Sequence, residues 1–446
     1  MDKLKFKGSI RPVHALIAVI AVALLVRAYL APFSAGSDIP QFYGFGNTML
    51  HHPLDFYAYA SGDHWKAEGW PYNWPYVYGP ALAYFLGFLR LLGIGSIKYF
   101  WDSSGYHVYI ARSWVVAVKS LFIAADIGIA GVLYAYASRK LKNGWTGVLL
   151  AALYLFNPMV IYVSSIYGMF DGMAVLPFLL GIYFLETGNR KLGYFLIGFS
   201  LAVKHTILFP AIIVLWDAFL RGRWKGLMKS LKPFLAGIIV PFAPFLLRPS
   251  SLLKIPKLMQ GMEPGYTYPI SYNLNGVVSL LTYVHDKAGI DTMFYMKHWW
   301  LFSLAALGVV LFIHMKTRNL ELSLALSYTA FLLTYWRVNT QYTLPFFAFM
   351  ALALVSSDWS TRALELLAGL PATLWPLMFP TSFWFHVHFE KPNWDMVRFI
   401  DRHTLMVFDT WPFVELSLIF TFLLFALITW ALAATLSGGC RNGEPT

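Results

Sequence analysis

Residues 13–30 read VHALIAVIAVALLVRAYL, an almost wholly apolar run that is long enough to decide the fold class. A helix needs about 20 such residues to cross the ~30 Å hydrocarbon layer of a bilayer. Similar runs recur along the chain as far as Leu436. Hydrophobic residues make up 58% of the 446 residues and charged residues 13%, whereas a soluble domain carries about 25% charged residues. The sequence therefore predicts an all-α, polytopic transmembrane helical bundle.

The stretch before this run, from Lys3 to Arg11, is basic and resembles the positive flank of a signal peptide. No small-residue cleavage site follows Leu30, so we expect a retained signal anchor. The net charge of +12 does not indicate a nucleic-acid partner, because the basic residues form short clusters between apolar segments. The single cysteine, Cys440, excludes an intrachain disulfide and a thiolate metal cluster.

The basic clusters predict the topology, because Lys and Arg are enriched on the cytoplasmic side of membrane proteins. They lie at residues 3–11, 139–142, 190–191, 221–232 and 316–318 and at Arg362. Threading the chain through them predicts about 11–13 helices in one domain over residues 1–436, both termini cytoplasmic, and a short tail at 437–446. The apolar segments are expected near residues 13–31, 113–136, 145–165, 169–186, 192–207, 209–220, 233–247, 299–315, 320–335, 343–356, 363–380 and 411–436.

Three long segments then fall on the outer side, at residues 33–112, 248–298 and 381–410. We expect the functional site among them. The first loop is rich in Trp, Tyr, Pro and Gly and includes a mostly apolar stretch from Pro80 to Gly95. This stretch is too short to cross a bilayer comfortably, so we expect an interfacial helix there.

Lys204 and His205 stand out because of their expected depth. Only 29 residues separate Lys191 from Arg221, whereas two full crossings need about 40. An isolated ammonium inside a membrane costs about 2.5 kcal/mol or more, so it normally faces a cavity and a partner. A lipid phosphate is one candidate partner for Lys204. The alternatives are snorkelling to the outer interface and an ion pair with a carboxylate such as Asp171.

Two acidic residues are expected at the outer ends of apolar segments. Asp171 follows a polar turn and either faces the outer cavity or caps the next helix. Asp38 emerges directly after the first crossing, between a glycine and a proline. It is either a functional acid or a solvated cap residue, and its surroundings alone favour neither.

Residues 336–342, WRVNTQY, form a short turn between two apolar segments. Arg337 at an outer membrane edge could clamp a phosphate, and Asn339 and Gln341 could hydrogen-bond a sugar. The same turn could instead be an interfacial anchor built of Trp, Arg and Tyr.

Support for other chemistries is weak. His386, His388 and Glu390 alternate in a way compatible with metal binding, but the spacing supplies no further ligand. The chain has no Walker loop, GxGxxG or GxSxG motif. We therefore expect neither a metal nor another cofactor.

Taken together, these features resemble the GT-C superfamily of polyprenyl-phosphate-sugar-dependent glycosyltransferases, over about residues 27–345. Residues 165–171, SIYGMFD, and 202–210, AVKHTILFP, resemble the WGQFD and AVKPQ motifs of prokaryotic, mannosyltransferase-like members. The first loop is similar to that of the ER dolichyl-phosphate-glucose glucosyltransferases of N-glycan precursor assembly. There an acid precedes a YPPL box, and here Asp38 precedes YVYGPAL at 76–82, followed by a helix with an expected buried acid, Asp126. Residues 338–342, VNTQY, resemble the family's VHEQY turn.

The resemblance implies that Asp38 is the catalytic base of an inverting transfer. One carboxylate can suffice, because phosphate is a good leaving group that needs little acid catalysis. The resemblance also implies that Lys204, His205 and Arg337 hold the donor phosphate as its charge develops. The implied sugar pocket contains Asp171, Asn339, Gln341, Tyr342 and Tyr78.

The leading hypothesis is a membrane hexosyltransferase. It would move mannose or glucose from a polyprenyl- or dolichyl-phosphate carrier to a glycan or lipid acceptor on the extracytoplasmic or luminal face. The rival hypothesis is a polytopic transporter or lipid flippase, and a third is a non-catalytic scaffold that binds sugar or lipid. We expect a monomer that contacts membrane lipid, in the plasma membrane of a prokaryote or the ER membrane of a eukaryote.

Overall fold

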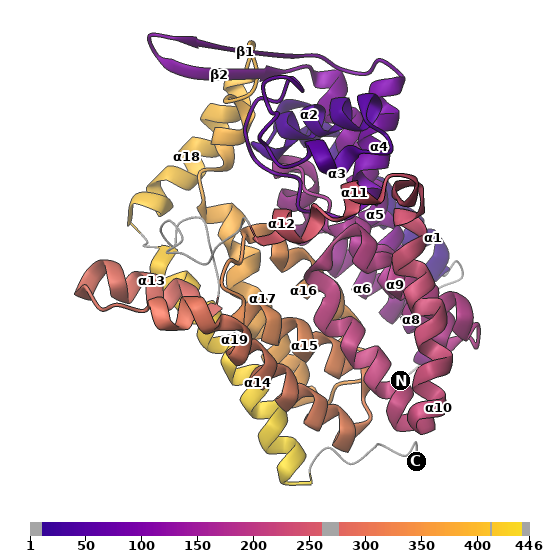
Figure 1. The fold of residues 1–446 in the computed structure, drawn as a ribbon. Coiled ribbons are helices and arrows are strands. Elements are labelled where there is room, and N and C mark those ends of the chain that lie inside the picture. Colours follow the sequence, from indigo (N-terminus) through magenta and orange to yellow (C-terminus); the bar gives the residue numbers. More distant parts are fainter. Residues whose placement is uncertain (1–10, 261–275, 411–412, 439–446) are drawn as a thin grey trace.

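A computed structural model describes residues 11–260, 276–410 and 413–438. These residues form a bundle of helices topped by a loop region (Figure 1), so the predicted all-α polytopic bundle is confirmed. Parts of several predicted features lie outside the described residues: the basic residues 3–10, the segment 261–275 of the second outer loop, residues 411–412 and the tail from 439.

The helices of the bundle follow the predicted apolar segments, usually within a few residues. They are α1 (Pro12–Leu30), α5 (Arg112–Lys140), α6 (Gly144–Leu155), α7 (Pro158–Ile161), α8 (Asp171–Glu186), α9 (Arg190–Val203), α10 (Leu208–Phe242), α14 (Met293–Thr317), α15 (Leu320–Thr334), α16 (Thr343–Ala353), α17 (Trp359–Met378) and α19 (Phe413–Leu436). Short helical turns connect some of them: η1 (Ala31–Phe33), the π-helical η2 (Tyr162–Tyr167), η3 (His205–Ile207), η4 (Ala243–Leu247), η5 (Thr340–Tyr342) and η6 (Thr381–Phe385).

Fewer helices than predicted are long enough to cross a membrane unaided. Within the described ranges, five pass by length and composition: Pro12–Phe33, Arg112–Lys140, His205–Leu247, Met293–Thr317 and Glu415–Leu436. The pair Gly144–Leu155 and Pro158–Tyr167, bent by 55°, makes a sixth if it is one span. The number falls below 11–13 because several expected crossings form short helices, such as α9 with 14 residues and α16 with 11. Polar turns end these helices early.

The expected short hairpin between residues 191 and 221 is present as α9 and the first part of α10, which pack together. The chain leaves helical geometry at Arg223, with φ 52° and ψ −150°, so α10 consists of two helices separated by a kink. The basic cluster at 221–232, expected between two apolar segments, lies within α10.

The first outer loop has more structure than predicted. It contains α2 (Asp38–His51), α3 (Phe56–Tyr59), α4 (Pro80–Leu91) and an antiparallel hairpin of β1 (Ile97–Asp102) and β2 (Gly105–Ile110), in which Ile97 pairs with Ile110. Figure 1 shows these elements together at the upper end of the bundle. The helix expected at 80–95 is present as α4, which packs against α2. The later outer loops contain α11 (Pro249–Leu252), α12 (Ile255–Gln260), α13 (Gly276–Ala288) and α18 (Trp394–Thr410).

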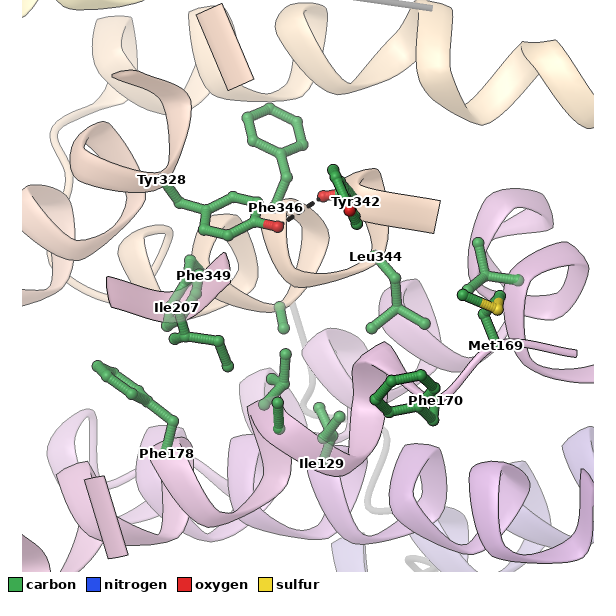
Figure 2. Close-up of a cluster of buried hydrophobic side chains, with 14 of the residues drawn as sticks. Ile129, Met169, Phe170, Phe178, Ile207, Tyr328, Tyr342, Leu344, Phe346 and Phe349 are labelled. Carbon is green, nitrogen blue, oxygen red and sulfur yellow. Dashed lines mark hydrogen bonds between the residues drawn. The ribbon is translucent and has the colours of Figure 1, made fainter. Parts of the chain in front are cut away.

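Aromatic packing between α8, α15 and α16 forms part of the core (Figure 2). Phe178 lies edge-on to Phe349 with ring centroids 5.2 Å apart, and Tyr328 lies 5.6 Å from the same ring. Aromatic pairs of this kind add about 0.5–1.5 kcal/mol beyond the area that they bury. The Tyr328 hydroxyl donates a hydrogen bond of 2.9 Å to the carbonyl of Tyr342. The core therefore holds the turn around η5 in place.

Candidate active site

A cavity of about 480 Å³ gathers most of the residues that the sequence singled out. Seven of the nine predicted site residues line it: Asp38, Tyr78, His205, Arg337, Asn339, Gln341 and Tyr342. They come from the first loop, from η3 and from the turn around η5, so chain segments about 300 residues apart meet here. We call this space the acidic-base cavity because Asp38 is its carboxylate. The remaining two predicted residues, Asp171 and Lys204, form an ion pair with each other.

Asp38 is the first residue of α2, and its carboxylate accepts a hydrogen bond of 2.8 Å from the Tyr167 hydroxyl. The backbone holds the two segments together as well, because Gly36 donates its N–H to the Tyr167 carbonyl at 2.7 Å. A β-carbon at Gly36 would lie 2.3 Å from the Tyr167 ring, so only glycine permits this approach. The base candidate is thus fixed against η2 by two hydrogen bonds.

Lys119 of α5 strengthens the same junction from behind. Its ammonium is fully buried and donates to the carbonyls of Ser34 at 2.6 Å, Ser165 at 2.7 Å and Ile166 at 2.8 Å. It also reaches the Ala31 carbonyl at 3.3 Å. One cation therefore ties the turn that precedes Asp38 to the turn that carries its hydrogen-bond donor. We call this arrangement the carbonyl cage.

The electrostatics of Asp38 combine opposing effects. Burial raises the pKa of the Asp38 carboxyl above its ordinary value, and this is the largest effect. The Tyr167 hydrogen bond lowers the pKa, and so do the nearby charges of Lys204 and Arg337. Asp38 is therefore a stronger base than an ordinary aspartate, and the cations Lys204 and Arg337 lie near it.

Lys204 follows the last residue of α9 in an extended conformation and is almost fully buried. Its ammonium lies 2.7 Å from the Asp171 carboxylate, which is one of the alternatives that the sequence left open. The rings of Phe170, Tyr342 and Tyr78 surround it, with centroids 4.7, 4.9 and 5.7 Å away. Aromatic faces attract a cation, so the pair is enclosed as well as neutralised.

The segment around Tyr78, residues 76–82, is held by direct backbone contact with the end of α9. Gly79 donates its N–H to the Val203 carbonyl at 3.3 Å. A β-carbon at Gly79 would lie 1.7 Å from the Ala202 carbonyl oxygen, so this contact requires glycine. The first loop is in this way fixed beside Lys204.

Arg337 and His205 face the cavity and remain available to a ligand. The Arg337 side chain is exposed, and in the part of the chain that the structure describes no carboxylate pairs with it. His205 is partly exposed and lines the same space. The cavity therefore holds a carboxylate on one side and an unpaired guanidinium on another.

Aromatic side chains that the sequence analysis did not single out form a wall of the cavity. They are Trp74, Tyr162, Tyr167, Trp375, Phe379 and Trp384. Trp375 and Phe379 are stacked at 4.5 Å, and the Trp384 indole donates a hydrogen bond of 3.2 Å to the Tyr162 hydroxyl. Tyr167 stood within the quoted SIYGMFD motif, which was the available signal. Trp74 lies in the aromatic-rich first loop and Tyr162 in η2. The other three lie in or between α17 and η6, where the sequence has no distinguishing pattern.

Gln41 holds the cavity's first-loop wall from the same helix as Asp38. Its side chain donates to the Trp74 carbonyl at 3.1 Å and accepts from the Tyr72 N–H at 3.2 Å. The rings of Tyr72 and Trp74 are stacked at 4.4 Å, and Trp74 is 41% exposed. An exposed indole of this kind offers a flat face beside the base.

The structure also places the buried acid and the histidines that the sequence analysis noted outside the predicted site. Asp126 is buried, as expected, and lies 3.6 Å from Arg27 of α1. His388 is buried and its ring lies 3.3 Å from the Val108 carbonyl, where it joins the last outer loop to β2. Burial lowers the pKa of His388 to about 4. Among the described residues, no group of three or more His, Cys, Asp or Glu side chains could hold a metal ion.

Comparison with known proteins gives a family and a similar solved structure. The model of glycosyltransferase family 87 matches residues 76–336, which is more than half of the chain. This stretch includes Tyr78, Asp171 and Lys204 but neither Asp38 nor Arg337. The crystal structure of ArnT from Cupriavidus metallidurans bound to undecaprenyl phosphate is similar with a TM-score of 0.47 and 13% identity, covering 95% of this chain and 78% of that chain. No curated protein matches the chain in sequence.

Proposed function

Because the chain belongs to glycosyltransferase family 87 and is a membrane glycosyltransferase, we propose that it transfers a hexose from a polyprenyl-phosphate carrier, with Asp38 as the base. The observation that carries this proposal is that Asp38 and Arg337 line the same cavity. The carboxylate is suited to accept a proton, and the guanidinium is suited to bind a phosphate.

The proposed reaction is a single displacement with inversion. The acceptor hydroxyl oxygen forms a bond to the anomeric carbon while the bond from that carbon to the phosphate oxygen breaks. Asp38 receives the hydroxyl proton, and the polyprenyl phosphate leaves with the bonding electrons. The raised pKa of Asp38 supports this role, because it makes the carboxylate a stronger base than an ordinary aspartate.

The proposed donor site uses the cations around the cavity. Arg337 and His205 contact the donor phosphate, because both face the open space. Lys204 acts through its field, since its ammonium is held by Asp171 outside the cavity lining. Charge that develops on the leaving phosphate is stabilised most strongly in a site from which water is excluded.

The proposed sugar pocket is formed by the polar and aromatic residues between the base and the cations. Asn339 and Gln341 offer hydrogen bonds to hydroxyl groups, and Tyr78 and Tyr342 offer ring faces. Asp171 shapes this pocket by fixing Lys204. Mannose and glucose are both compatible with such a lining, and no metal is required.

The proposed topology places the cavity on the extracytoplasmic or luminal side with both termini cytoplasmic. It is supported by the predicted basic clusters, of which residues 190–191 and 221–232 lie at the far ends of the helices that end at the cavity. The membrane would be the plasma membrane of a prokaryote or the ER membrane of a eukaryote. The transporter or flippase hypothesis has no comparable support, because the family is one of enzymes.

The test uses purified protein in nanodiscs with radiolabelled polyprenyl-phosphate-mannose and polyprenyl-phosphate-glucose and a total membrane lipid extract as acceptor. We expect transfer of one labelled sugar. Asp38→Asn should lower the turnover by about 10²–10⁴-fold, the usual contribution of a general base. Asp102→Asn, which removes an exposed carboxylate of the hairpin in the same loop, should leave turnover unchanged. Undiminished transfer by folded Asp38→Asn would refute the role assigned to Asp38. No transfer from either donor by folded wild-type protein would favour the transporter or scaffold hypothesis.

A further inference from the structure

A second cavity, of about 180 Å³, lies at the far ends of the helices that end at the acidic-base cavity. Its lining includes Glu186 at the end of α8, Arg190 at the start of α9, and both sides of the kink in α10. Helix α9 has 14 residues and rises about 1.5 Å per residue, so the two cavities are separated by roughly 20 Å. We call this space the basic cavity.

Positive charge dominates the basic cavity. Its charged lining residues are Arg190, Lys191, Arg221, Lys229, Glu186 and Asp217. Asp217 is already neutralised, because its carboxylate lies 2.7 Å from Arg221 and 3.3 Å from His314. Over residues 11–260, 276–410 and 413–438, no carboxylate lies within ion-pair distance of Arg190, Lys191 or Lys229. Three cations therefore share one small space with one carboxylate, Glu186.

The helix ends make this arrangement unfavourable without an anion. Arg190 and Lys191 are the first two residues of α9, where the helix dipole is positive and favours negative charge. Like charges that face one cavity also repel one another. A bound anion would relieve both effects. The side chains would hold it, because the N–H groups of Arg190 and Leu192 already donate to the Gly188 carbonyl and the Asn189 side chain.

The surface next to the basic cavity indicates where that anion comes from. The part of α10 just after the kink carries exposed apolar side chains, including Trp224 at 69% and Met228 at 48%. A surface of this kind faces lipid, and tryptophan is enriched where the hydrocarbon meets the headgroups. The basic cavity therefore opens at the level where lipid phosphates lie.

We propose that the basic cavity binds the phosphate group of an anionic membrane lipid, at a site separate from the catalytic one. Basic pockets between transmembrane helices near the membrane surface bind such headgroups. This proposal does not depend on the identity of the sugar, the acceptor or the catalytic base. It assigns a role to cations that would otherwise be read only as topology signals.

The test is native mass spectrometry of the full-length protein with phosphatidylglycerol, phosphatidylcholine or inorganic phosphate. We expect phosphatidylglycerol to bind more tightly than phosphatidylcholine. Arg190→Gln/Lys229→Gln should weaken its binding by about 25-fold, at about fivefold for each cation removed. Binding is read directly, so the result is independent of transferase activity.

The control is Lys316→Gln/Arg318→Gln, which removes the same charge from another predicted basic cluster outside the cavity. It should leave phosphatidylglycerol binding within twofold of wild type. Equal loss in both double variants would show that only general surface charge matters and would overturn the site. Full competition by millimolar inorganic phosphate would assign the cavity to a soluble phosphate instead of a lipid. Thermal unfolding checks that both variants are folded.

Discussion

The two ends of helix α9 handle positive charge in opposite ways. At one end Lys204 is 1% exposed, pairs with Asp171 and is enclosed by aromatic rings. At the other end Arg190 and Lys191 are exposed and have no carboxylate partner among the described residues. A cation deep in the bundle must be satisfied by the protein itself, because neither water nor headgroups reach it. A cation at the membrane surface is solvated by water and can bind a ligand from outside the protein.

Lys119 is also a buried cation, but its charge is satisfied by different partners. Among the described residues no carboxylate pairs with it, and backbone carbonyls from two chain segments, 31–34 and 165–166, accept its hydrogen bonds. Hydrogen bonds to a charged group contribute about 1.5–3 kcal/mol each, so such a cage can hold chain segments as firmly as an ion pair. The comparison teaches that the buried cations Lys119 and Lys204 fix geometry, whereas Arg190 and Lys191 have charge left to bind a ligand.

We expect the largest effect, a loss of folding stability, when the ion pair of Lys204 and Asp171 is broken. Lys204→Met leaves Asp171 buried without a partner, and breaking a buried pair in this way costs about 3–5 kcal/mol. Lys191→Met at the other end of α9 should change stability by less than about 0.5 kcal/mol. Unfolding in detergent, followed by tryptophan fluorescence, measures both. Equal stability of the two variants would contradict the contrast.

A double variant sharpens this prediction. Lys204→Met/Asp171→Leu removes both charges, and replacing a buried pair by apolar residues is often neutral for stability. We expect most of the lost stability to return while turnover stays reduced, because the positive field near Asp38 is absent. Recovery of both stability and turnover would mean that the pair has no part in donor binding.

The next effect concerns the carbonyl cage. Lys119→Met should lower turnover about tenfold, because the turn that carries Asp38 and the turn that carries Tyr167 are no longer held together. Lys98→Met, which removes an exposed cation paired with Glu390, is the matched control and should have no effect. A purely structural role would lower the amount of folded protein without changing the pH dependence. We therefore expect the acid limb of the kcat/KM profile to move in the Lys119 variant alone.

The smallest effect is a shift in pH dependence. A base works when deprotonated, so activity falls as the pH drops through the pKa of Asp38, which is raised above its ordinary value. Tyr167→Phe removes a hydrogen bond that favours the charged carboxylate, so it should move the acid limb upward by about one pH unit. Activity near pH 8 should be nearly unchanged. A downward shift, or no shift, would show that this hydroxyl does not tune the base.

Much of the candidate site was predictable because its residues are chemically conspicuous. A carboxylate just after a crossing, a lysine at membrane depth and an Arg-Val-Asn-Thr-Gln-Tyr turn are each unusual in an apolar chain. The partners of these residues were not predictable. Tyr167 meets Asp38 across 129 positions, and no local pattern encodes such a contact. The hairpin at 97–110 was not predicted, because these residues were treated only as part of the aromatic-rich first loop.

By itself the sequence determined the all-α membrane bundle, because apolar runs of helix length leave the backbone no other way to satisfy its hydrogen bonds in lipid. It also determined which charged residues needed a partner or a cavity, because a charge in such a run is costly. Only the tertiary structure decided which charges meet. Lys204 pairs with Asp171, Lys119 donates hydrogen bonds to backbone carbonyls, and Arg337 faces the cavity. Those outcomes depend on how distant helices pack, since a buried charge takes whichever partner the fold brings within reach.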